Sequence, residues 1–169
     1  MPLSMYQASI PVFTKALTNL SKILEKAEAS ATARKIDPAV LLQTRLYPDM
    51  FPLVRQVQIA SDGVKGGAAR LAGIEIPKYD DVEKTFPELQ ERIAKTQKFI
   101  DGISAAQIDG SEDKEIVLPI GKDQTMTLKG QAFLFGFVFP NLYFHATTSY
   151  AILRHCGVEV GKRDFLGQF

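Results

Sequence analysis

The sequence is poor in several features, and each shortage excludes a class of protein. It has one cysteine, Cys156, so no disulfide can form within the chain. Neither sign of charge dominates, because 20 Lys and Arg residues face 19 Asp and Glu residues. A balanced charge of this kind argues against a broad surface for nucleic acid or for an anionic membrane. We therefore expect neither nucleic acid nor a membrane among its partners.

Long hydrophobic runs are also missing. The longest, from Ala132 to Pro140, is far shorter than the ~20 residues that span a membrane. No Lys or Arg precedes Lys15 and no uninterrupted apolar run follows Met1, so a signal peptide is not indicated. A single cysteine fits a reducing compartment. We expect a soluble, cytoplasmic protein that folds as one domain over residues 1–169, since 46% of its residues are apolar.

Start and stop signals divide most of the chain into helices. Ser4 followed by Gln7 resembles a capping box and opens a helix over about residues 4–30. Asp49 is expected to cap a second long helix, which Gly73 ends. The remaining predicted elements are a short helix over 37–46, a helix over 85–103, two strands over 115–120 and 125–128, and a final helix over 130–156.

The final segment gives two conflicting signals. Its phenylalanines at 133, 135, 137 and 139 alternate with the period of a strand. The length of the segment and the helical stripe that follows favour a helix instead. Pro140 should distort that helix and free the carbonyl of Gly136, because proline has no N–H to donate.

Four helices of this length, joined by short connections, predict an all-α four-helix bundle with a small β-hairpin before the last helix. Glycines 63, 66 and 67 lie in the middle of the second long helix, where each costs ~1 kcal/mol relative to alanine. We expect them to allow a close approach between two helices.

A polar stripe on the final helix is the strongest functional signal. Asn141, His145, Thr148 and Ile152 share one helical face. Buried polar groups need partners, so another helix has to supply a hydrogen-bond partner for His145. The candidate ligand-binding residues are Asp49, Gln56, Asn141, His145 and Thr148. His145 is either a general base or ligand-binding group in the core, or a packed histidine bonded to a neighbouring helix; we expect its pKa to be depressed.

Three segments carry a family resemblance: Leu46 to Met50, Arg92 to Thr96, and Pro140 to Gly167. They resemble the family of unknown function numbered 1993, which is similar to the DinB/YfiT-like four-helix-bundle metalloenzymes. That superfamily binds a divalent metal through one histidine on the second helix and an HxxxH pair on the fourth. The resemblance places His145 at the second position of the pair and Asn141 at the first, with no histidine on the second helix. It thus implies a degenerate site, with no metal and no cofactor.

Several functions remain open at this point. The first is a helical bundle with an apolar pocket between helices around His145, which binds a small apolar ligand. The second is a cofactor-independent isomerase, hydrolase or transferase with His145 as general base. The third is a divalent-metal protein with a reduced ligand set, in which His145 and Asn141 are joined by a carboxylate and waters. The fourth is a structural or dimerising module, which makes a homodimer one of the expected assemblies.

Overall fold

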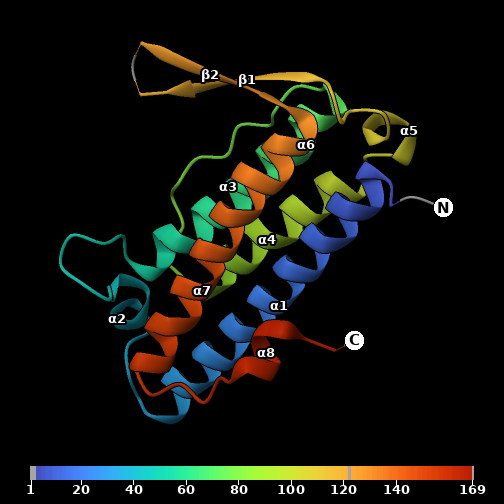
Figure 1. The fold of residues 1–169 in the computed structure, drawn as a ribbon. Coiled ribbons are helices and arrows are strands. Elements are labelled where there is room, and N and C mark those ends of the chain that lie inside the picture. The colour runs from blue at the N-terminus through green and yellow to red at the C-terminus, as the bar shows by residue number, and fades with distance from the viewer. Residues whose placement is uncertain (1–2, 122, 169) are drawn as a thin grey trace.

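In a computed structural model that describes residues 3–121 and 123–168, four long helical segments run side by side (Figure 1). They are α1 (Met5–Ala33), α3 (Leu53–Ala72), α4 (Phe86–Asp101) and a final segment of α6 (Gly130–Phe133), η1 (Leu134–Val138) and α7 (Phe139–His155). The shorter helices are α2 (Pro38–Gln43), α5 (Ala105–Ile108) and α8 (Lys162–Leu166). Strands β1 (Glu115–Ile120) and β2 (Gln124–Lys129) form an antiparallel hairpin that projects from one end of the bundle. The predicted fold class is confirmed.

Local capping explains where several helices begin. The Ser4 hydroxyl accepts from the backbone N–H of Gln7 at 3.2 Å, which completes the predicted capping box of α1. The prediction for Asp49 is wrong, however. The N-cap of α3 is Pro52, and Asp49 is an exposed residue of the preceding turn. A residue before proline is disfavoured in helical geometry, so the helix cannot start before Pro52.

The last helix accommodates Pro140 by widening one turn. The phenylalanine-rich run is helical, as predicted, and residues Leu134–Val138 form a π-helix. In it the backbone N–H of Phe139 donates to the carbonyl of Leu134, five residues earlier. The distortion expected from Pro140 therefore lies in the turn before it. The side-chain amide of Asn141 donates to the carbonyl of Phe137 at 2.7 Å, which satisfies one backbone acceptor at this junction.

Helix α3 lies at the centre of the bundle and is buried on almost every side. It packs against α4 on one side and α7 on another. A Cβ added at Gly67 would lie 2.8 Å from Cγ1 of Val138, so this glycine permits the close approach of η1. An added Cβ would meet nothing within 4 Å at Gly63, and only the helix's own Arg70 at Gly66. The predicted close approach thus depends on Gly67 alone.

A second glycine fixes the junction between the hairpin and the final helix. A Cβ at Gly130 would lie 1.9 Å from the carbonyl oxygen of Ser111, an impossible separation. The next residue, Gln131, donates its backbone N–H to the carbonyl of Glu112 at 2.9 Å. The start of α6 is therefore held against the chain segment that precedes β1, and this contact sets the direction of the final helix.

Helices α1, α3 and α4 and the final segment enclose one hydrophobic core, with Phe13, Phe86 and Phe133 among its largest fully buried side chains. Within the described ranges, none of the helices combines the length and the apolar character that crossing a membrane requires.

The glycine contacts predict opposite outcomes for two alanine substitutions in one helix. Gly67→Ala should lower the free energy of unfolding by ~1–3 kcal/mol, because the stiff Val138 side chain has to move. Gly63→Ala should raise it by up to ~1 kcal/mol, because the new methyl group meets nothing and alanine favours the helix. Urea unfolding monitored by circular dichroism measures both. A Gly67→Ala protein as stable as the wild type would show that η1 can move away from α3.

Candidate functional site

His145 meets a buried glutamine from the central helix. Gln56 of α3 is only 1% exposed, and its Oε1 lies 2.7 Å from Nδ1 of His145 on α7. The other end of the same carboxamide donates from Nε2 to the carbonyl of Phe51 at 3.0 Å. That second bond makes Oε1 the acceptor, so Nδ1 of His145 carries the proton. In the neutral imidazole this leaves Nε2 with a free lone pair.

The surroundings of His145 favour this neutral form. Burial lowers the pKa of His145 below its ordinary value of 6.5, and the positive charge of Arg55 lowers it further. The ring of Phe144 stands edge-on to the imidazole, with 5.2 Å between the centroids. A neutral ring with a fixed tautomer can accept a hydrogen bond or a proton at Nε2.

The other predicted site residues do not join this pair. Asp49 is exposed in the turn before α3, and the Asn141 amide is bonded to the carbonyl of Phe137. Thr148 is buried, but its hydroxyl donates to the carbonyl of Phe144, one turn back, at 2.7 Å. Of the five predicted residues, the structure therefore brings together only Gln56 and His145.

The side chains present do not fit the divalent metal of the DinB/YfiT-like superfamily. Divalent transition metals in proteins are held by three or more histidine, cysteine or carboxylate donors. No group of three such residues lies close enough to hold an ion anywhere in the described part of the chain. In this structure Gln56 offers a neutral amide oxygen that is already hydrogen-bonded to His145, and Asn141 is bonded to the helix backbone.

An apolar groove lies between α1, α7 and α8. Its volume is about 350 Å³, and it is half-open to solvent. The apolar lining comes from Val12, Ala16, Leu20 and Ile23 of α1, Tyr143 and Ala146 of α7, and Phe165 and Leu166 of α8. Polar side chains contribute only Lys15 and Asn19 to the lining, and His145 does not belong to it. The groove thus lies on a different face of α7 from the histidine.

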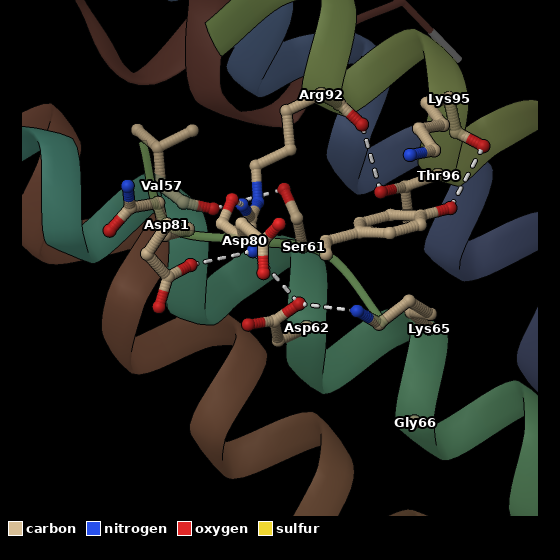
Figure 2. A network of polar contacts seen from close by, with 12 residues as sticks. Val57, Ser61, Asp62, Lys65, Gly66, Asp80, Asp81, Arg92, Lys95 and Thr96 are labelled. Atoms are coloured by element: carbon tan, nitrogen blue, oxygen red, sulfur yellow. Dashed lines mark hydrogen bonds and ion pairs between the residues drawn. The ribbon is translucent and has the colours of Figure 1, made fainter. Parts of the chain in front are cut away.

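A polar network around Arg92 was not predicted from the sequence. The Arg92 side chain of α4 is 1% exposed and reaches three carboxylates. One terminal nitrogen lies 2.9 Å from Asp62 and 3.0 Å from Asp81 (Figure 2). The other donates to Glu83 at 2.9 Å and to the carbonyl of Asp80 at 3.1 Å. Only its Nε lacks a hydrogen-bond partner among the described residues.

Further side chains complete this network on its outer side. Lys65 pairs with Asp62 at 2.8 Å (Figure 2). Arg55 pairs with Asp81. Buried Gln58 donates to Glu83 at 2.8 Å. Burial raises the pKa of Glu83, but hydrogen bonds from Arg92 and Gln58 outweigh it and leave the pKa below its ordinary value. The carboxylates of the 74–85 linker are thereby tied to both α3 and α4.

Tyr79 of the same linker is held by cations. The ammonium groups of Lys65 and Lys95 lie 3.8 Å and 4.2 Å from the centroid of its ring. Two features of the sequence could have revealed this site. Arg92 interrupts the apolar stripe of its helix beside Ile93, and acidic residues cluster at positions 80, 81 and 83. A buried cation and a nearby run of acids predict an ion-pair network once the linker is known to cross α4.

The fold and site define a class before any comparison with other proteins. A four-helix bundle with a hairpin before its last helix, and a last-helix histidine that faces the second long helix, has the DinB type of architecture. A crystal structure described as a DinB family member from Shewanella denitrificans superposes with a TM-score of 0.89 at 46% identity, covering 97% of this chain and 92% of that one.

The family of domains of unknown function called DUF1993 matches residues 5–166. The chain belongs to this family. The comparison with curated proteins gives no match.

The donor set predicts the metal content of the purified protein. Zinc, nickel and iron should each be well below one ion per chain, because a histidine with amide oxygens is a poor donor set for them. Elemental analysis of protein purified without added metal or chelator measures this. One equivalent of metal that is lost in His145→Ala would contradict the expectation.

The buried guanidinium predicts a large effect from one substitution. Arg92→Met should lower the free energy of unfolding by ~3–5 kcal/mol, because Glu83 loses its cation, while Asp62 and Asp81 each lose one of two. Lys98→Met is the matched control: Lys98 is exposed on the same helix and should matter by less than ~0.5 kcal/mol. Urea unfolding of both variants makes the comparison. Equal effects would show that the network contributes nothing specific.

Proposed function

We propose that this protein binds a small apolar ligand, without a metal, in the groove between α1, α7 and α8. The observation that supports this is the groove itself. Its volume of about 350 Å³ lies within the range of small-molecule sites, and its lining is mostly apolar. We also propose that it acts in the cytoplasm, where its single cysteine, Cys156, would stay reduced.

The lining narrows the class of ligand. Asn19 already donates from Nδ2 to the carbonyl of Phe165 at 3.0 Å, so it ties α8 to α1. The pairing of Lys26 with Asp164 at 2.6 Å adds a second tie. These ties support α8 as a fixed wall of the groove. An apolar body with at most one hydrogen-bonding group, such as a small aromatic molecule, fits such a lining.

The His145–Gln56 pair supports a second candidate function, that of a cofactor-independent enzyme. The fixed tautomer and the lowered pKa of His145 leave Nε2 able to take a proton at neutral pH. Gln56 would act as the residue that orients the imidazole. In this proposal His145 is the general base, and a substrate would approach the α3–α7 contact rather than the groove.

Indole, a small aromatic molecule with one N–H, is a suitable probe for the groove. In heteronuclear NMR spectra it should shift the signals of Ala16, Leu20 and Ile23. Ala16→Phe should abolish these shifts, because the larger side chain fills the groove. Ala29→Phe is the control, since Ala29 is exposed on the same helix and does not line the groove. Shifts that survive in Ala16→Phe, or that are absent from the wild type, would refute the groove as a site for such a ligand.

The histidine pair makes a separate prediction. Nitrogen-15 NMR should show Nδ1 of His145 protonated and its pKa below 6.5. In Gln56→Leu the preference for the Nδ1–H tautomer should disappear, because the acceptor is gone. Asn141→Leu should leave it unchanged, because that amide faces its own helix.

The lowered pKa of His145 also predicts how the stability of the protein depends on pH. The unfolded chain binds the proton of this histidine more readily than the folded protein does, so stability should fall as the pH drops below about 6.5. In His145→Gln this part of the pH dependence should vanish in urea melts. A titration that finds His145 charged above pH 7 would contradict both expectations.

A further inference from the structure

The groove between α1, α7 and α8 has one charged side chain on its walls. Among the described residues that line it, only Lys15 of α1 carries a charge. The two acidic residues of α1, Glu25 and Glu28, do not belong to the lining. Asp164 of α8 lies outside it as well, and it pairs with Lys26. The electrostatic character of this apolar groove therefore comes from a cation.

The two polar side chains of the lining have different roles. Lys15 and Asn19 lie one turn apart on α1, so they share one side of that helix. Asn19 is buried and donates to the carbonyl of Phe165, which makes it part of the wall. Lys15 is exposed at the groove. Its ammonium group has three N–H donors, so it can bind a ligand oxygen while it keeps a contact with the protein.

We propose that the ligand of this groove is a small aromatic carboxylate, whose ring lies against the apolar wall and whose carboxylate pairs with Lys15. This inference rests on the proposed function of the groove. Tyr143 of α7 and Phe165 of α8 contribute aromatic rings to the lining, and a ring packed against another ring gains more than its buried area alone. A hydrogen bond between an ammonium group and a carboxylate is also stronger than one between neutral groups.

The charge and the size of the groove select this class of ligand over others. A cationic ligand would be repelled by Lys15. A phosphate monoester carries nearly two negative charges, and the lining offers a single cation to replace its water. A volume of about 350 Å³ lies at the small end of the range for ligand sites, which favours a compact ring over a long chain. One carboxylate on a small aromatic body meets all three conditions.

Two probes of nearly the same shape test the role of the charge. Indole-3-acetate carries a carboxylate, and indole-3-acetamide has a neutral amide in its place. Titrations at neutral pH, followed by the NMR signals of Ala16, Leu20 and Ile23, give both dissociation constants. The wild type should bind the carboxylate about three- to fivefold more tightly, because an ion pair at an exposed lysine is worth little in water. Added salt should reduce this preference.

Substitutions at Lys15 should change the preference and leave the groove intact. Lys15→Met should bind the two probes equally, with its affinity for the amide unchanged. Lys15→Glu should reverse the preference, because the new carboxylate repels that of the probe. Lys22→Met is the matched control, since Lys22 is exposed on the same helix and does not line the groove. This control should keep the wild-type preference, and circular dichroism checks that every variant is folded.

The outcomes separate this inference from the function on which it rests. Equal affinities in the wild type would overturn the carboxylate and leave the groove as a site for neutral apolar molecules. A preference that survives in Lys15→Met, fails to reverse in Lys15→Glu or disappears in Lys22→Met would also overturn it. If indole and both probes leave the signals of the groove unshifted, the inference and the proposed function are both wrong.

Discussion

The guanidinium of Arg92 is buried between two helices and a linker. The positions of these elements depend on which groups pair with that charge. A buried cation without partners would cost several kcal/mol, so acceptors have to surround it. Asp62 comes from α3, while Asp81 and Glu83 come from the linker that crosses to α4. The same contacts that satisfy Arg92 therefore fix the long connection over residues 74–85 against the bundle, where an unstructured loop of this length would otherwise be expected.

The final helix follows a different constraint. It contains no charged residue before Arg154, and it has to pass Gly67 closely while accommodating Pro140. The π-turn over Leu134–Val138 satisfies both demands, because it widens the helix where proline removes a donor and places Val138 against Gly67. One side of the resulting helix completes the core, and another is left as an aromatic surface.

The contact of His145 with Gln56 distinguishes this site from the metal site that the family resemblance implied. The wider superfamily uses a histidine on the second long helix, and this chain has an amide in contact with the last-helix histidine. An amide oxygen fixes the tautomer of the imidazole and leaves Nε2 available, whereas a set of three histidine nitrogens would favour a metal. In the second candidate function proposed above, this geometry makes Nε2 of His145 the hydrogen-bond or proton acceptor.

The sequence by itself determined the local features. The capping box at Ser4, the hairpin before the last helix, and the helical character of the phenylalanine-rich run depend on neighbouring residues, so they could be predicted. The pairing of His145 with a residue of another helix was anticipated because a polar stripe needs partners. The predicted start of α3 at Asp49 is wrong, because the helix begins after Pro52. Both residues lie within one turn and both are typical of helix starts, so local propensity alone could not distinguish them.

Only the tertiary structure decided the rest, because those features depend on distances between residues far apart in the chain. Asn141 and His145 share a helical face, yet one amide turns to its own backbone while the imidazole finds Gln56, 89 positions away. The apolar groove appears beside α8, not around His145, because the C-terminal segment folds back onto α1. Arg92 is likewise buried only because the linker brings Asp81 and Glu83 across α4. Periodicity along one helix cannot reveal which residues another segment will place opposite it.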